Sequence, residues 1–119
     1  MASGEINKLV RELRKFAANR DWNQFHSPKN LSMALSAEVA EIVEHFQWLT
    51  EKESGSLSRK KRAELENEIG DVLIYLLRLS DKLGVDPMYA ARKKLRQNAR
   101  KYPIRKAKGN AMKYTEFSD

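Results

Sequence analysis

The sequence predicts an all-α protein built as a four-helix bundle, and three observations support this prediction. Apolar residues recur every three or four positions over most of the chain, which is the period of a helix with one buried face. Residues typical of helix ends stand between these stretches. The 119 residues contain no strand-like alternation and no glycine-rich phosphate loop. A chain of this length forms one domain with a modest core.

The first half of the chain predicts two helices joined by an irregular connection. Residues 4–19 carry apolar side chains at helical spacing, namely Ile6, Leu9, Val10, Leu13, Phe16 and Ala17. Residues 19–30 lack this period, and connections of this length often carry function. The period returns over residues 28–49, which predicts the second helix.

The third predicted helix is long and apolar on more than one side. Residues 51–58 form a polar link, after which Ser58 can cap a helix that ends near Leu83, with Gly84 in a left-handed conformation. Apolar side chains also lie away from its main apolar stripe, at Leu73, Ile74 and Leu77. A helix that is apolar nearly all round is buried on several faces, so we expect contacts between subunits.

The last predicted helix opens at Asp86 and Pro87, because Asp is a good N-cap and Pro is tolerated in the first turn. It ends at residues 102–103. Residues 104–119 carry few apolar side chains. We therefore expect an all-α domain over residues 1–103, followed by a basic, extended C-terminal tail.

Two acidic couplets interrupt the predicted apolar faces. Glu38 and Glu41 lie in the second predicted helix, and Glu68 and Asp71 in the third. Residues three apart project from the same side of a helix, so each couplet aims two carboxylates in one direction. Four carboxylates facing a shared interior would repel one another unless a cation lay between them. Oxygen ligands on rigid helices suit Mg²⁺, with Mn²⁺ as a substitute.

The alternative is that these acids are surface charges paired with lysines along their helices. The positions four residues after them hold no lysine, but Ile42, His45, Val72 and Tyr75. His45 follows Glu41 by one turn and could face the cluster. However, Ile42 stands where a Glu-x-x-His di-iron motif needs an acid. We therefore expect an all-carboxylate metal site.

The net charge of +7, from 23 basic and 16 acidic residues, is unevenly distributed. Between Arg92 and Lys113 there are ten basic residues and no acid. This balance suits a polyanionic ligand held through both a cation and lysines. A non-catalytic nucleic-acid-binding protein that uses this basic third is the alternative. This alternative gives the acidic couplets no role, because carboxylates without a bound cation repel phosphate. Nucleic acid is therefore the less favoured partner.

Composition also bounds the location of the protein. Cysteine is absent, which fits a reducing compartment. No apolar run approaches the roughly 20 residues of a membrane span. We expect a soluble, cytoplasmic protein without membrane contact.

Further polar and aromatic residues are candidates for binding the rest of a substrate. In the last predicted helix, Lys94, Asn98 and Lys101 lie within about 60° of one another. Such a stripe is usually a solvated face, but beside a carboxylate–metal cluster these side chains become good phosphate ligands. Four aromatic side chains could stack on a flat base or, alternatively, pack in the core: Trp22, Phe25, Trp48 and Tyr75.

These residues resemble a known family. An E-x-x-E motif, 26 intervening residues and an E-x-x-D motif form the signature of the all-α MazG-like nucleoside triphosphate pyrophosphohydrolases. Segments similar to the dCTP pyrophosphatase branch read RDWNQFH, PKNL, FQW, DVLIY and KYTE. The similarity runs from about Phe16 to Glu116.

The resemblance implies the activity and the cofactor. It implies hydrolysis of a deoxynucleoside triphosphate, best dCTP or a 5-modified dCTP, to the monophosphate and pyrophosphate. Excess or non-canonical nucleotides would be removed in this way. Mg²⁺ would neutralise the triphosphate and lower the pKa of a bound water, whose proton a carboxylate would accept. The resemblance implies that the metal ligands, which are also the catalytic residues, are Glu38, Glu41, Glu68 and Asp71.

The resemblance also implies the substrate contacts and the assembly. The base pocket would use Trp22, Trp48 and Tyr75, with His26 of the RDWNQFH motif as a further candidate. The phosphates would contact Lys94, Asn98 and Lys101. Neighbouring subunits of a homotetramer would complete each site. Where that branch can carry a base-facing histidine in the first helix, this chain has Leu13, so we expect only a modest preference among bases.

Overall fold

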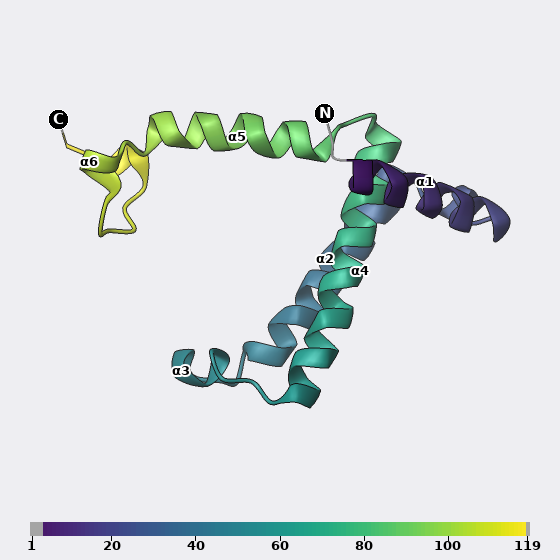
Figure 1. The fold of residues 1–119 in the computed structure, drawn as a ribbon, viewed down its shortest axis with the longest axis horizontal. Coiled ribbons are helices and arrows are strands. Elements are labelled where there is room, and N and C mark those ends of the chain that lie inside the picture. The colour runs from purple at the N-terminus through teal and green to yellow at the C-terminus, as the bar shows by residue number, and fades with distance from the viewer. Residues whose placement is uncertain (1–3, 119) are drawn as a thin grey trace. The chain divides into compact units, whose positions relative to one another are not determined.

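The computed structural model describes residues 4–118, and these residues confirm the all-α class (Figure 1). They contain no strand. They form two compact units, residues 4–85 and residues 86–118, each described here by itself. The helices and 3₁₀ turns, in order, are α1 (Gly4–Asn19), η1 (Asn23–Phe25), α2 (Pro28–Phe46), α3 (Glu51–Ser54), α4 (Arg59–Leu83), α5 (Pro87–Lys101), α6 (Ile104–Ala107) and η2 (Tyr114–Glu116).

The first unit is organised around α4. Helix α2 lies alongside α4 over most of its length, and α1 also packs against α4 (Figure 1). Residues of the predicted apolar faces, namely Ala17, Leu31 and Leu65, are buried at these contacts, because burial removes apolar surface from water. The prediction for Leu77 was wrong: it was expected away from the main apolar stripe of α4, but it is buried within this chain. Within residues 4–118 the buried apolar side chains are Ala17, Leu31, Leu65 and Leu77.

The helix ends follow the predicted chemistry closely. The Ser58 side chain accepts a hydrogen bond from the Lys61 backbone N–H at the start of α4. Gly84 ends α4 with φ = 68°, the left-handed conformation that glycine adopts without a steric penalty. Helix α2 ends at Phe46, three residues earlier than predicted. The polar link contains the short helix α3, which a capping box between Thr50 and Glu53 starts.

The second unit contains the last predicted helix and, from residue 104, the segment that the sequence predicts as an extended tail. Helix α5 begins where Asp86 accepts hydrogen bonds from two backbone N–H groups. Residues 104–118 are not simply extended, because they include α6 and η2. The Tyr102 ring lies edge-on to the rings of Tyr114 and Phe117, at 5.9 and 5.7 Å between centroids. These aromatic side chains hold the segment against the end of α5, which the low apolar content of the segment did not reveal.

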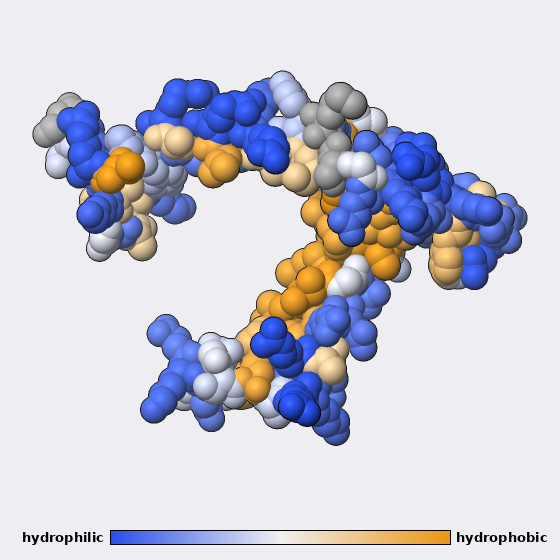
Figure 2. Space-filling model, in the orientation of Figure 1, coloured by the Kyte–Doolittle hydropathy of each residue, from blue (hydrophilic) through white to orange (hydrophobic). Residues whose placement is uncertain are grey.

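Apolar surface remains uncovered along α2 and α4 (Figure 2). On α4, Ile69 is 59% exposed, and Leu73 and Leu76 are also exposed. On α2, Val39 and Val43 are exposed. The predicted apolar character of α4 on several sides is therefore present at the surface of this single chain. Within residues 4–118, no helix is long and apolar enough to cross a membrane.

Candidate metal and nucleotide site

Three of the four predicted metal-ligating carboxylates meet between α2 and α4. Glu38 and Glu41 project from α2 and Glu68 from α4, and each offers an oxygen within 4.8 Å of the others. They converge because the two helices lie side by side and each couplet repeats after one helical turn. Asp71 lies outside this tight group, yet close enough for its charge to raise the pKa of both Glu38 and Glu68.

The arrangement of these carboxyl groups disfavours the ionised form of Glu38 and of Glu68. Burial, followed by the neighbouring carboxyl group of Glu41, raises the pKa of Glu38 to about 7. A hydrogen bond with Glu41 and then burial raise the pKa of Glu68. The Oε2 atoms of Glu38 and Glu68 are both buried without a hydrogen-bond donor among the described residues. Buried carboxylate oxygens with no donor are unusual and call for a compensating positive group.

These residues fit a divalent metal ion. The donor set is entirely oxygen, which is the preference of Mg²⁺ and Mn²⁺. The two unpartnered oxygens come from different helices, so a cation between them would satisfy both. Its charge would also stabilise the ionised carboxylates, and so oppose the burial and the neighbouring acids that raise the pKa values of Glu38 and Glu68.

A second group of charges adjoins Glu68. The Nε2 atom of His45 lies 4.0 Å from Glu68 Oε1, and its Nδ1 atom lies 3.3 Å from Lys61 Nζ. Lys61 also pairs with Glu64 at 3.7 Å. His45 therefore faces the cluster, where it lies close to Glu68. It lies outside the group of three carboxylates that could hold an ion together.

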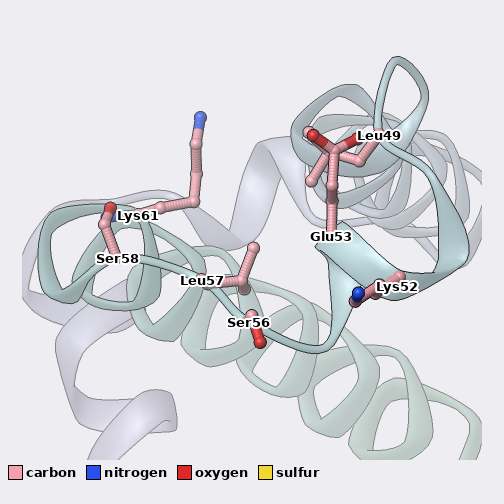
Figure 3. Close-up of a pocket in the computed structure, with 7 residues that line it drawn as sticks. All are labelled: Leu49, Lys52, Glu53, Ser56, Leu57, Ser58 and Lys61. Carbon is pink, nitrogen blue, oxygen red and sulfur yellow. The ribbon is translucent and has the colours of Figure 1, made fainter.

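Lys61 also lines a cavity of about 410 Å³ between α3 and the start of α4. Figure 3 shows Lys61 extending from the first turn of α4, with Lys52 and Glu53 of α3 across the cavity. The remaining lining residues are Leu49, Ser56, Leu57 and Ser58. Because this cavity contains an acid as well as two lysines, its charge does not clearly favour an anion.

A smaller, mainly apolar cavity of about 200 Å³ lies where α1 and the η1 loop meet α4. Its lining includes two of the predicted base-contacting aromatics, Trp22 and Tyr75, and also His26. The Trp22 ring lies edge-on to the rings of Phe16 and His26, at 5.7 and 6.1 Å. The complete lining is Leu13, Phe16, Ala17, Trp22, His26, Ile74, Tyr75 and Arg78.

Tyr75 connects this cavity to the carboxylates. It follows Asp71 by four residues and therefore lies one turn further along the same side of α4. An α-helix rises about 1.5 Å per residue, so the cavity and the carboxylate cluster are separated by about one to two helical turns. With a cation bound by the carboxylates, this spacing would suit a ligand with a flat apolar end and an anionic end.

Sequence reasoning missed Arg78, which also lines the cavity. Only 4% of this residue is exposed, and it bonds to Asn23 and His26 in the η1 loop. Its sequence signal is a single charge in the otherwise apolar run LIYLLRLS, three residues after Tyr75. A charge in such a position has to be paired inside the fold.

Four predicted substrate-binding residues are not among the residues that line this cavity. Trp48 follows the end of α2 and is 87% exposed. Lys94, Asn98 and Lys101 lie in α5 of the second unit. The Lys101 ammonium lies 4.9 Å from the centre of the Tyr114 ring. The contacts of these four residues with a substrate stay predictions.

Comparisons with known proteins find similar sequences and a similar solved structure. The chain is 47% identical to dCTP pyrophosphatase 1 of Homo sapiens and 45% identical to that of Bos taurus, over 115 residues in each case. These matches cover 95% of this chain, which spans 66% of the length of those relatives. A crystal structure of a pyrophosphatase from Archaeoglobus fulgidus DSM 4304 is also similar, with a TM-score of 0.80 and 40% identity. That similarity covers 87% of this chain and 96% of the other.

The family model named MazG-like matches residues 33–117. This range contains all four predicted metal-ligating acids and most of the chain. Together with the acidic couplets on α2 and α4, the match shows that this chain belongs to the MazG-like family.

Proposed function

We propose that this protein is a divalent-metal-dependent nucleoside triphosphate pyrophosphohydrolase. Its substrate is a deoxynucleoside triphosphate, with dCTP or a 5-modified dCTP favoured, and its products are the monophosphate and pyrophosphate. The observation that carries the proposal is the cluster of Glu38, Glu41 and Glu68, with two unpartnered buried oxygens, beside an aromatic cavity. The names of the relatives supply the nucleotide and the base.

The cation-binding residues in this proposal are Glu38, Glu41, Glu68 and Asp71, with Mg²⁺ as the cofactor and Mn²⁺ as a substitute. When bound, the cation neutralises the triphosphate and makes water a stronger acid. One of the four carboxylates accepts the proton of the attacking water. The water attacks the α-phosphorus, the bond from that phosphorus to the bridging oxygen breaks, and pyrophosphate leaves.

The substrate-binding residues divide between the two ends of the nucleotide. Trp22 and Tyr75 hold the base in the cavity of about 200 Å³. Lys94, Asn98 and Lys101 bind the phosphates, where two ammonium groups stabilise the charge of the leaving pyrophosphate.

The proposal includes a homotetramer. Trp48, at 87% exposure, would complete the base pocket of a neighbouring copy, and the uncovered apolar surface of α2 and α4 would be buried between copies. It also includes a cytoplasmic role in removing excess or non-canonical nucleotides.

The direct test measures pyrophosphate and phosphate release from dCTP, dTTP, dATP and dGTP, each with Mg²⁺ and with a chelator. We expect pyrophosphate release that requires Mg²⁺ and is highest with a pyrimidine nucleotide. Release of single phosphates, or no release from any of the four substrates, would overturn the proposed reaction. Mg²⁺-independent release would overturn the role of the carboxylates.

A further inference from the structure

Arg78 is a charged residue placed in the wall of an otherwise mainly apolar cavity. Its guanidinium group comes from α4 at the turn after Tyr75, and the residue is 4% exposed. Burying an arginine is costly unless its charge and its N–H groups are paired. The pairing of Arg78 therefore shows what holds the group in place and what it still lacks.

Two contacts fix the guanidinium group to the η1 loop. Arg78 Nη2 donates to Asn23 Oδ1 at 3.0 Å and lies 3.2 Å from His26 Nδ1. His26 can accept this bond only when its Nδ1 atom carries no proton. Burial, followed by the charge of Arg78, lowers the pKa of His26, which favours that state.

A third contact fixes the group to α4 and α1. Arg78 Nη1 lies 3.8 Å from Asp81 Oδ2, and Asp81 accepts two hydrogen bonds from Arg14 of α1, at 2.7 and 2.5 Å. Arg14 is not among the residues that line the cavity. The guanidinium group is thus held in one orientation by Asn23 and His26 of the η1 loop and by Asp81 of α4, before any ligand is present.

One donor of this fixed group has no acceptor. The Nε–H group of Arg78 is buried and makes no hydrogen bond within residues 4–118. A buried donor without an acceptor destabilises the free protein, and a ligand acceptor that reaches it recovers that free energy. Arg78 lines the same cavity as Trp22 and Tyr75, where the proposed function places a nucleobase.

We propose that Arg78 is a specificity-determining residue of the nucleobase cavity, where its guanidinium group donates a hydrogen bond to a carbonyl oxygen of the base. This inference rests on the proposed function. Cytosine, thymine and uracil each carry a carbonyl oxygen at C2, whereas adenine carries none. Arg78 therefore favours pyrimidine nucleotides and disfavours adenine, because adenine leaves the buried charged donor unpaired.

The test measures binding without hydrolysis, by calorimetry with dCMP, dTMP and dAMP. We expect the wild-type protein to bind dCMP and dTMP about tenfold more tightly than dAMP, as one charge-assisted hydrogen bond predicts. Arg78→Met removes the guanidinium group but keeps an unbranched side chain on the cavity wall. In this variant the dissociation constants for dAMP and for dCMP or dTMP should differ by less than about threefold, mainly because dCMP and dTMP bind more weakly. Equal binding of the three monophosphates by the wild-type protein would overturn the inference.

Arg11→Met is the matched control, because it removes an exposed arginine of α1 that belongs neither to this network nor to the cavity wall. It should keep the wild-type binding ratio. A ratio that survives in Arg78→Met, or that is lost equally in Arg11→Met, would contradict a direct role for Arg78.

If Arg78→Met does not fold, Arg78→Lys decides. Lysine keeps the charge but not the Nε–H group, so a ratio reduced at least threefold supports the inference and an unchanged ratio overturns it. Because these ligands are monophosphates, the outcome is independent of the pyrophosphate-release test. A protein that hydrolyses dNTPs but binds dAMP as well as dCMP would refute only the role of Arg78.

Discussion

At the scale of single residues, the position of Glu41 on α2 determines which carboxyl groups it approaches. It projects from α2 toward Glu68 of α4, and its carboxyl group raises the pKa values of both Glu38 and Glu68. Without a cation, the ionised carboxylates destabilise one another, whereas a bound divalent ion would neutralise their charge.

Glu41→Gln should therefore abolish Mg²⁺-dependent pyrophosphate release while helical content, measured by circular dichroism, stays unchanged. We expect a loss in kcat/KM of more than about a hundredfold, since even residues one step removed from a metal typically cost 10–100-fold. Asp71→Asn should behave in the same way. Glu66→Gln is the control, because Glu66 lies on another side of α4 and lines a different cavity, next to Ile69. Wild-type turnover in Glu41→Gln would remove the carboxylates from the mechanism.

The pKa of Glu38 predicts how stability depends on pH. In the folded protein the pKa is about 7, above its ordinary value of 4.5, so the folded state binds its proton more tightly than the unfolded state between these values. The free energy of unfolding should then decrease as pH rises from about 4.5 to 7. Without divalent cations, the melting temperature of wild type should fall more between pH 5 and pH 8 than that of Glu38→Gln.

Mg²⁺ should reverse this destabilisation, and should raise the wild-type melting temperature more at pH 8 than at pH 5. Identical pH profiles for wild type and Glu38→Gln, or no effect of Mg²⁺ at either pH, would contradict the described cluster.

Replacing Leu13 with histidine should increase the selectivity for dCTP over dTTP. Leu13 lines the cavity of about 200 Å³ that the proposed function assigns to the base. Leu13→His adds a polar group that can hydrogen-bond to a base edge, and one such bond corresponds to about a fivefold change. The ratio of kcat/KM for dCTP over dTTP should rise by about that factor. Arg11→His, on an exposed position of the same helix, should leave the ratio unchanged.

At the scale of elements, the ends of α4 position the site residues that it carries. Gly84 stops α4 at φ = 68°, and a Cβ atom at this position would meet no other atom within 4 Å. A substitution there is therefore penalised by backbone conformation and not by crowding.

Gly84→Ala should lower the free energy of unfolding by about 1 kcal/mol, whereas Gly84→Asn should cost less, because asparagine tolerates the left-handed conformation. Urea denaturation of the two variants measures the difference. Equal stability of Gly84→Ala and wild type would mean that the helix does not end in this way.

At the scale of the whole molecule, the uncovered apolar surface of α2 and α4 predicts self-association. Val39, Val43, Ile69, Leu73 and Leu76 are all exposed in the single chain. Soluble monomers rarely expose a contiguous apolar patch of this kind. The proposed tetramer would remove it from water.

Light scattering should return about four times the chain mass of 13.8 kDa at micromolar concentration. Leu73→Glu should shift the protein toward smaller species, because it places a charge in the buried interface. Lys60→Glu, a charge reversal in the exposed first turn of α4, should not. A wild-type mass near 13.8 kDa would refute the assembly.

The sequence by itself determined the helices and the direction in which each couplet points. Helical period, caps such as Ser58 and the stop at Gly84 are local properties, which depend on residues within a few positions of one another. For the same reason, pairing Glu38 with Glu41 and Glu68 with Asp71 needed no knowledge of packing. The resemblance of the acidic spacing to a known family added the expected chemistry.

Only the tertiary structure decided which of these groups meet. The register of α2 against α4 brings Glu68 into the group with Glu41, with Asp71 further out, and it sets the burial that raises the pKa of Glu38. Arg78 meets Asn23 across 55 positions of sequence, so no local pattern could reveal that contact. Likewise, contacts of the Tyr102 ring with the rings of Tyr114 and Phe117 hold a segment whose composition predicts an extended tail. Contacts between distant residues and the loss of water around a charge depend on packing, which the helical period does not specify.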